Sequence, residues 1–177
     1  MRLLAAFDKF KDSFSALEAC SLLEQVTEDH SEKLEVISCP LTDGGEGFVD
    51  ILTNQYKGEF LELEARDSLG SLKQTKIGWL PLDRLSEGVC SLLQVPRKGN
   101  LAILEMASVC GLSDLATDQR NPWRTSTVGV GDLLKFATNQ GADAILLGIG
   151  GSSTNDAGLG ALSVLGLEIS DGQGQKI

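Results

Sequence analysis

The segment at residues 146–160, with the sequence LLGIGGSSTNDAGLG, constrains the fold of this chain more than any other. The apolar run at residues 144–147 predicts a short buried strand, and leucines 159, 162 and 165 follow at helical spacing. Glycines and then hydroxyl, amide and carboxylate side chains lie between the strand and the helix. A strand that passes through glycines into the start of a helix favours an anion, because backbone N–H groups and the positive helix end face it.

The residues of this segment alone support two interpretations. Glycine has no Cβ and lets a ligand approach the backbone, which makes the segment a candidate phosphate-binding loop. Asp156 adds a carboxylate that could hold Mg²⁺ or accept a proton. In the alternative interpretation the glycines serve only the turn. The candidate phosphate-binding residues are Gly150, Gly151, Ser152, Ser153, Thr154 and Asn155.

Charge and composition argue against several classes of partner. The formal net charge of −10 disfavours nucleic acid and anionic membrane surfaces, so an anionic substrate would need a local basic pocket or a metal. There is no apolar run of about 18 residues, which argues against a transmembrane helix, and the N-terminus becomes charged too early for a signal peptide. We therefore expect a cytoplasmic protein whose four cysteines are reduced. A single histidine, His30, argues against a Ser-His-Asp triad or a multi-histidine zinc site.

The N-terminal region has the pattern of a β-α-β unit. Residues 2–7 and 33–39 are apolar runs that predict two strands, and Ser15 and Glu18 form a capping box for a helix between them. The crossover rule predicts that the two strands are parallel. Because ligands of such sheets bind at the carboxyl ends of the strands, the loops that follow the two strands are expected at the same edge.

The second of these loops has the sequence DGGEG at residues 43–47 and is called the acidic glycine loop below. Its glycines allow a tight turn, and its two acids, Asp43 and Glu46, would lie at the rim. The alternative is an Asp N-cap with glycines in the turn. A helix follows, whose inward side chains are expected to be Phe48, Ile51, Leu52 and Tyr56.

The middle of the chain is β-rich. Residues 60–67 and 71–80 alternate apolar and polar side chains and predict two antiparallel strands joined by a turn. Residues 91–95 and 101–107 are predicted as two further strands. Glu105, near the end of the last one, is either a site residue or simply exposed.

A polar, irregular segment precedes the last helix–strand–helix pattern. Arg120 lies in it, and its planar guanidinium could clamp a carboxylate or a phosphate. Residues 125–131 then combine hydroxyls with glycines at the start of a helix, which suits either an oxyanion or a helix cap.

Five segments together resemble the bacterial glycerate kinases, which phosphorylate glycerate with ATP. They follow one another in family order and span nearly the whole chain. They are residues 7–16 (FDKFKDSFSA), 40–47 (PLTDGGEG), 103–107 (ILEMA), 120–131 (with RNP and TSTVGVG) and 148–158 (GIGGSSTNDAG).

The resemblance implies an α/β protein of two lobes with the active site between them. It implies a flavodoxin-like lobe with a parallel sheet at residues 1–57, and a second α/β lobe with the β-rich segment at residues 58–177. Members of the family are considerably longer than this chain. The chain resembles their N-terminal half, and both lobes are expected to be incomplete.

The activity implied by the resemblance is Mg²⁺-assisted phosphoryl transfer from ATP to a hydroxyl of glycerate, giving 2- or 3-phosphoglycerate. No Walker A motif occurs, so other groups must position the phosphates and neutralise their charge. Asp8 is expected to accept the hydroxyl proton, and Lys11 is expected to pair with the transferred group. The remaining expected contacts are Arg120 and Glu46 with glycerate, Asp43 as a catalytic and metal-binding residue, and Asp156 with the metal.

The chain also departs from the family pattern, at Phe7, Lys9 and Asp12 among others. Asp12 would place a carboxylate in a loop expected to face an anionic substrate. One alternative is therefore a truncated, inactive fragment that binds nucleotide or a small organic acid, or self-associates through an unfinished sheet. Another is a flavodoxin-like cofactor-binding protein, although Trp79 and Trp123 are too far apart in sequence to suggest a flavin sandwich.

Overall fold

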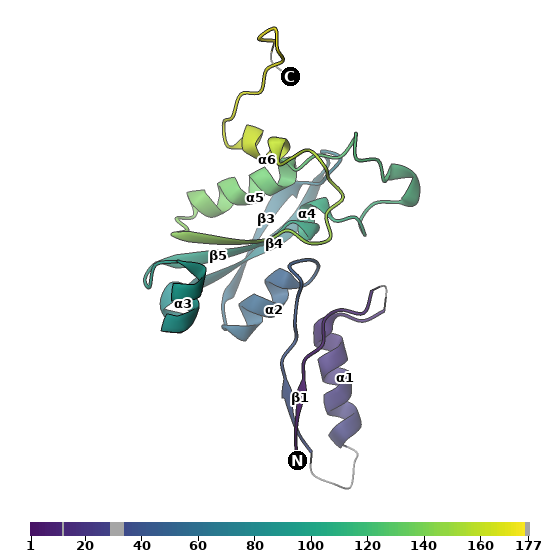
Figure 1. The fold of residues 1–177 in the computed structure, drawn as a ribbon, viewed down its shortest axis with the longest axis vertical. Helices are drawn as coiled ribbons and strands as arrows, with labels where there is room; N and C mark the ends of the chain where they lie inside the picture. Colours follow the sequence, from purple (N-terminus) through teal and green to yellow (C-terminus); the bar gives the residue numbers. More distant parts are fainter. Residues whose placement is uncertain (12, 29–33, 176–177) are drawn as a thin grey trace. The chain divides into compact units, whose positions relative to one another are not determined.

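The computed structural model describes residues 1–11, 13–28 and 34–175. It divides into two compact units, unit 1 at Met1–Asp43 and unit 2 at Gly44–Ile177 (Figure 1). Asp12 and His30 lie outside the described residues, and so does the helix end expected near His30. Both units combine strands with helices, and both contain parallel strand pairs, which confirms the expected α/β class.

Unit 1 is a β-α-β unit, as predicted. Strand β1 (Arg2–Ala5) pairs in parallel with β2 (Glu35–Ser38), and helix α1 (Ala16–Glu28) connects them. The predicted capping box is present. The Glu18 N–H donates to Ser15 Oγ at 3.2 Å, and the Ser15 N–H donates to Glu18 Oε2 at 2.8 Å. Each bond satisfies a backbone donor that the first turn of a helix leaves open.

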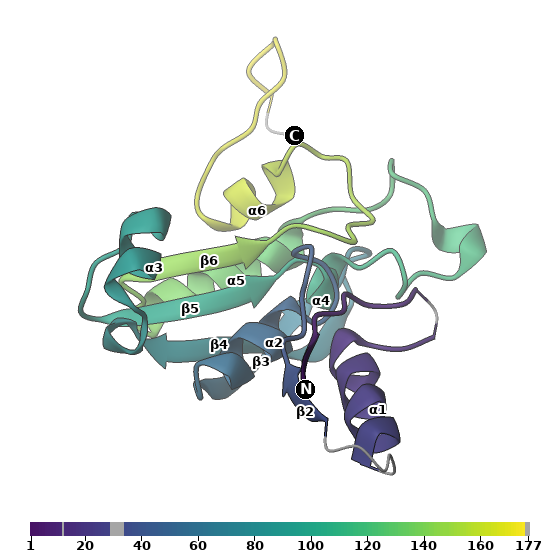
Figure 2. The same ribbon diagram turned by 60° about the horizontal axis from the view of Figure 1, so that its bottom comes forward.

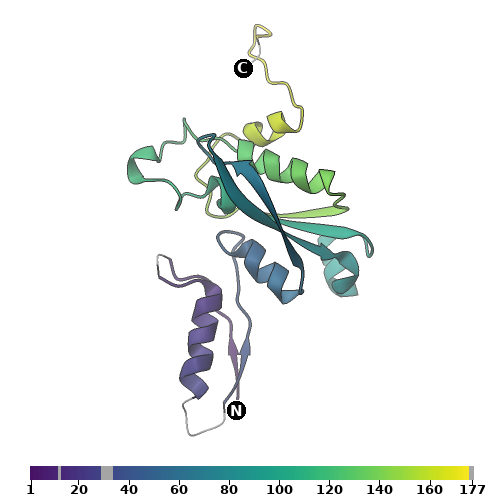
Figure 3. The same ribbon diagram turned by 180° about the vertical axis from the view of Figure 1, so that it is seen from behind.

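Unit 2 is built on a mixed sheet of four strands. In sheet order they are β3 (Glu59–Arg66), β4 (Leu72–Pro81), β5 (Asn100–Glu105) and β6 (Ala144–Gly148). The first three are antiparallel neighbours, and β6 is parallel to β5. The predicted hairpin is the β3–β4 pair, which lies in the foreground of Figure 3. The strands predicted at residues 101–107 and 144–147 are also confirmed.

Helices cover both faces of this sheet (Figure 2). Helices α5 (Val128–Asn139) and α6 (Leu159–Val164) share one apolar cluster with the sheet, and α2 (Phe48–Gln55) and α3 (Glu87–Leu93) share another. The remaining short elements are η1 (Leu82–Arg84), α4 (Ala107–Cys110) and η2 (Thr117–Gln119).

Strand β5 is the centre of the core because successive side chains enter opposite clusters. Leu101 and Ile103 pack with the α2 side, and Ala102 and Leu104 pack with the α5 side. All four are buried. This explains why its sequence is a continuous apolar run and not an alternating one.

One predicted strand is wrong. The segment at residues 91–95 falls mostly within α3, which begins after Ser86, whose Oγ accepts the Val89 N–H at 3.3 Å. Gln94 ends the helix in the left-handed region, at φ 54°. A short apolar run has no clear period, and here the N-cap four residues before Cys90 was the signal for a helix.

Helix α2 was expected in the first lobe, but it packs with the sheet of unit 2. Val49 is buried in one cluster with Leu80 and Ile103. The compact division of the chain therefore comes at Asp43, before this helix, and not after residue 57.

Two expectations from composition can be compared with the structure. All four cysteines are free thiols, and three of them are buried. Burial raises the pKa of Cys110 to about 11, so this thiol is neutral at pH 7. No helix in the described part of the chain has the length and apolar character needed to cross a membrane.

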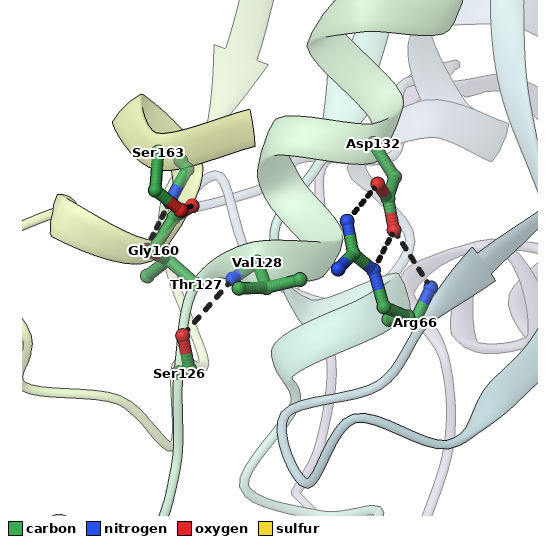
Figure 4. Close-up of polar contacts among 8 residues, drawn as sticks. Arg66, Ser126, Thr127, Val128, Asp132, Gly160 and Ser163 are labelled. Carbon is green, nitrogen blue, oxygen red and sulfur yellow. Dashed lines mark hydrogen bonds and ion pairs between the residues drawn. The ribbon is translucent and has the colours of Figure 1, made fainter. Parts of the chain in front are cut away.

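An ion pair fastens the end of β3 to α5 (Figure 4). Arg66 Nη2 lies 2.6 Å from Asp132 Oδ1, and Arg66 Nε lies 2.8 Å from Oδ2. The Arg66 backbone N–H also donates to Oδ2, at 3.1 Å. The side-chain hydrogen bonds from Arg66 hold the pKa of Asp132 below its ordinary value.

We expect Asp132→Asn to lower the free energy of unfolding by about 1–2 kcal/mol at pH 7, because the bidentate pair is only partly exposed. Since the folded pKa of Asp132 is lowered, this difference should disappear as the pH falls through that pKa. Urea denaturation of wild type and variant measures the loss at pH 7, and the same experiment in acid measures its disappearance. The control is Asp114→Asn, because the Lys73–Asp114 pair is more exposed at its carboxylate and should be worth about 0.5 kcal/mol or less. Equal losses of unfolding free energy for the two variants would show that the Arg66–Asp132 pair does not stabilise the fold more than an exposed pair does.

Candidate functional site

The loop after β6 packs backbone to backbone against the acidic glycine loop. The Gly150 N–H donates to Gly44 O at 2.9 Å, and the Met106 N–H donates to Gly148 O at 2.8 Å. A Cβ added at Gly148 would lie 2.6 Å from Gly44 O, and one at Gly150 would lie 2.6 Å from Gly45 N. The close approach of the two loops therefore requires these two glycines, whether or not a ligand is bound.

Glu46, predicted to contact the substrate, lies beside Gly151 of the predicted phosphate-binding loop. A Cβ added at Gly151 would lie 2.8 Å from Glu46 Oε1, and Gly151 has a φ of 68°. Ser113 Oγ lies 3.4 Å from the same oxygen. The structure thus brings these two predicted site residues together within unit 2.

The predicted phosphate-binding loop at residues 150–155 is called the donor loop from here on. Three of its side chains, those of Ser152, Thr154 and Asn155, make no hydrogen bond to any described residue. Ser153 differs, because both its N–H and its hydroxyl donate to Cys110 O, at 2.8 and 2.9 Å. The loop is therefore held in place through Ser153 and presents two hydroxyls and an amide with unused donors.

Asp156, predicted as a metal ligand, has a structural role in the fold of unit 2. Its carboxylate accepts the N–H groups of Gly158 and Gly160, both at 3.1 Å, and the Thr127 N–H at 2.8 Å. It also accepts the hydroxyls of Thr127, at 2.9 Å, and Ser126, at 3.3 Å. These donors lie at the starts of α5 and α6, so one carboxylate caps two helices.

The starts of α5 and α6 are not open to an external anion. The donors expected to bind an anion at the starts of α5 and α6 are turned toward the carboxylate of Asp156. The Ser126 hydroxyl also accepts the Val128 N–H at 3.3 Å (Figure 4). Burial alone would raise the pKa of Asp156, but the hydrogen bonds from Thr127, Gly160 and Gly158 outweigh it and the pKa is lowered. The carboxylate is charged at pH 7 and stands where an external anion would otherwise sit.

Unit 1 contains the three residues predicted to be catalytic, Asp8, Lys11 and Asp43. Asp43 Oδ1 lies 2.7 Å from the ammonium of Lys9, whose side chain is only 17% exposed. The exposed Asp8 accepts the Lys9 N–H at 2.7 Å. Lys11 is exposed on the rim of a groove of about 630 Å³ in unit 1. Aromatic side chains line that groove: Phe7, Phe10 and Phe14.

The two remaining candidate residues are Arg120 and Glu105. Arg120 is exposed, and its Nε donates to Leu115 O at 3.1 Å within the same irregular segment. Glu105 is not exposed, so that alternative is wrong: it is a buried acid at the end of β5.

The described residues contain no group of three or more histidine, cysteine or acidic side chains that could hold a metal ion. Mg²⁺ in kinase sites is held by one or two carboxylates and by substrate phosphates, so a smaller set is chemically adequate. The exposed carboxylate of Asp43 fits such a contact. Asp156 does not fit, because its two oxygens already accept five donor groups and a carboxylate offers about four lone-pair sites.

The sequence does not predict two contacts of the candidate site residues. Lys9 is the cation beside Asp43, and Thr127 is the main partner of Asp156. The only local signal for Thr127 was its place in a hydroxyl-rich segment before a helix. Nothing local identifies Lys9, because its partner is 34 residues away in the sequence.

Comparison with known proteins gives a consistent result. The profile of the glycerate kinase family matches residues 3–177. The chain is 34% identical to a glycerate kinase of Haemophilus influenzae and 30% identical to glycerate 2-kinase of Escherichia coli. All of this chain is aligned in both cases, with 43% and 42% of those proteins, so the chain spans less than half their length.

A solved structure from Salmonella typhimurium LT2, provisionally named glycerate kinase 2, superposes with a TM-score of 0.70 at 33% identity. It covers the whole of this chain, which corresponds to 43% of the Salmonella chain. The match of fold, segment order and family profile along the chain leads to one conclusion: this chain belongs to the glycerate kinase family.

Proposed function

We propose that this chain is part of an ATP-dependent glycerate kinase and carries the loop that binds the phosphates of ATP. The observation that carries the proposal is the donor loop, in which Ser152, Thr154 and Asn155 keep unused donors while Ser153 anchors the backbone. Phosphate oxygens accept only, so a rigid loop with free donors is a complementary surface. Family membership supports the reaction class.

The catalytic roles are assigned to residues of unit 1. Asp8 accepts the proton of the attacking glycerate hydroxyl, and Lys11 pairs with the transferred phosphoryl group. Both side chains are exposed, as groups that meet a substrate must be. Positioning and charge neutralisation of this kind supply most of the rate in phosphoryl transfer.

Three further residues are proposed to contact glycerate and Mg²⁺. Arg120 binds the glycerate carboxylate through the two guanidinium nitrogens that Leu115 O does not engage, and Glu46 accepts a glycerate hydroxyl beside Gly151. Mg²⁺, when bound with ATP, neutralises phosphate charge, and Asp43 is the residue that would hold it. Such an enzyme would work in the cytoplasm, where ATP is available.

A second candidate function is binding of nucleotide or a small organic acid without turnover, by the chain alone or by a self-associated form. It is favoured by one observation: the contact that anchors the donor loop, between Ser153 and Cys110, lies within unit 2, whereas the proposed catalytic residues belong to unit 1. The donor loop lies within unit 2 and serves either function.

The double variant Ser152→Ala/Thr154→Ala should bind MgATP about 30- to 1000-fold more weakly, since each of the two charge-assisted hydrogen bonds is worth about 1–2 kcal/mol. Isothermal titration calorimetry measures the dissociation constant. Ser91→Ala is the matched control, because Ser91 is exposed on α3 and its hydroxyl makes no hydrogen bond to any residue that the structure describes.

Release of ADP in the presence of glycerate, ATP and Mg²⁺ then separates the two functions. Glycerate-dependent release supports the kinase, whereas ATP binding without release supports the second candidate. Equal affinities of the double variant and Ser91→Ala would show that the donor loop does not bind the phosphates.

A further inference from the structure

Glu105 connects the central strand of unit 2 to the start of α2. It is the last residue of β5 and is 8% exposed. Its Oε2 accepts the Val49 N–H at 3.1 Å, and the Gly47 N–H also bonds to this carboxylate. The charged oxygens thus face two open donors in the first turn of a helix far away in the sequence.

Helix α2 has no cap of its own. The N-cap position is Gly47, which has a φ of 90° and no side chain to accept a hydrogen bond. Glu105 therefore does across the fold what an N-terminal Ser, Thr or Asp does locally.

The same region also supports the donor loop. Gly44 O accepts the Gly150 N–H, and Met106, the residue after Glu105, donates its N–H to Gly148 O. Residues 44–47 are consequently held by Glu105 at one end and contact the glycines that precede the donor loop at the other.

The carboxyl group of Glu105 is also one wall of a cavity of about 410 Å³ on the α2 side of the sheet. The charged groups around it are Asp50 on α2, Glu46 in the acidic glycine loop, Glu62 on β3 and Lys76 on β4. Lys76 is paired with Asp50 at 2.6 Å and lies 4.4 Å from the ring centroid of Phe60. The cavity gives protons a route to Glu105, and no cation is paired with its carboxylate in the described structure.

We propose that Glu105 is a positioning residue that holds residues 44–47 in the conformation on which the donor loop depends, and that only its ionised form does so. The proposal rests on the proposed function, because the donor loop is taken as the ATP phosphate site. An ionised carboxylate accepts both N–H groups of α2. A protonated one carries an O–H that faces a donor, so it loses part of the cap.

Burial raises the pKa of Glu105, and the nearby charges of Asp50 and Glu46 add to this, while the bonds from Val49 and Gly47 oppose it. Loss of the cap on acidification therefore begins at a higher pH than for an ordinary glutamate. The effect on overall stability has the opposite sign: a raised pKa contributes stability that is present in acid and is lost as the pH rises through the folded value. If Glu105 were only structural, its protonation would change the free energy of unfolding and leave the affinity for ATP unchanged. If it also positions residues 44–47, the affinity for ATP falls on acidification, while its contribution to stability changes in the opposite direction.

The test uses the full chain and compares Glu105→Gln with Glu62→Gln, which changes an exposed acid of the same cavity. At pH 8 we expect Glu105→Gln to bind MgATP about tenfold more weakly than wild type, the loss expected for one charge-assisted hydrogen bond. Wild type and Glu62→Gln should lose affinity for MgATP together as the pH is lowered from 8, and Glu105→Gln should lose less. The proposal would be overturned if Glu105→Gln bound MgATP as tightly as wild type at pH 8. It would also be overturned if the affinity of this variant fell with pH as steeply as that of wild type.

Backbone hydrogen exchange separates failure of this inference from failure of the proposed function. The amides of residues 47–50 and 149–151 should exchange at least about tenfold faster in Glu105→Gln than in Glu62→Gln. Faster exchange without any ATP binding by wild type would keep the positioning role and reject the nucleotide site. Unchanged exchange would reject the positioning role, whatever the binding result.

Discussion

The Asp156→Ala variant is expected to lose about 3–5 kcal/mol of unfolding free energy at pH 7, because a removed partner leaves several buried or partly buried donors unsatisfied. The donors are the N–H groups of Thr127, Gly158 and Gly160 and the Thr127 hydroxyl. Thr127 is 4% exposed, so water cannot easily replace the lost oxygen. Both α5 and α6 lose a cap at once, and urea denaturation followed by circular dichroism measures the loss.

The matched control is Asp171→Ala. Asp171 also accepts two backbone N–H groups, from Gln173 and Gln175, but it lies in an exposed turn of the tail. Its removal should cost about 0.5 kcal/mol or less, because water can replace it.

The pH dependence provides a second check on Asp156. Its folded pKa is lowered, so its contribution to stability is present above the unfolded pKa and is lost as the pH falls through the folded pKa. The difference in unfolding free energy between wild type and Asp156→Ala should therefore narrow as the solution is made acidic enough to protonate the folded carboxylate. An Asp156→Ala protein as stable at pH 7 as Asp171→Ala would show that the carboxylate is not the cap of α5 and α6.

The Gly150→Ala variant is expected to lose about 2–4 kcal/mol, because the new methyl group has no space to enter. Its Cβ would lie 2.6 Å from Gly45 N, 2.9 Å from Gly45 Cα and 3.0 Å from the Gly44 carbonyl carbon. All three are backbone atoms, which cannot rotate away as a side chain can. The two loops must then separate, and the hydrogen bond from Gly150 N to Gly44 O should break.

Thermal denaturation and hydrogen exchange of the Gly150 amide measure this effect. Gly172→Ala is the control, since a Cβ at Gly172 meets no atom within 4 Å and its φ is not positive. A Gly150→Ala protein with the melting temperature of Gly172→Ala would mean that the loops are not packed as described.

Sequence patterns predicted the elements whose signals are local. The β3–β4 hairpin follows from period-2 alternation, the start of α1 follows from the Ser15–Glu18 box, and β6 follows from an apolar run before glycines. The strand predicted at residues 91–95 is wrong because a five-residue segment with three apolar residues has no distinguishable period, and the segment lies mostly in a helix capped by Ser86.

The chemistry of the candidate site was harder to predict because its contacts are distant in sequence. Asp156 looked like a metal ligand by residue type, yet Thr127, 29 residues earlier, supplies the donors that occupy it. Glu105 could not be distinguished from an exposed acid until β5 was found at the centre of the sheet. The glycines after β6 were expected to open the backbone to a ligand, but at positions 148 and 150 the atoms that require glycine include the neighbouring backbone of Gly44 and Gly45.

The central claim is that residues 150–155 bind the phosphates of ATP, and an NMR titration of ¹⁵N-labelled protein tests it most directly. With MgATP, the largest saturable changes in amide chemical shift should fall at Ser152, Thr154 and Asn155, whereas adenosine, which has no phosphates, should leave these amides unchanged. Largest changes elsewhere, no saturable change with MgATP, or equal changes with adenosine would contradict the claim.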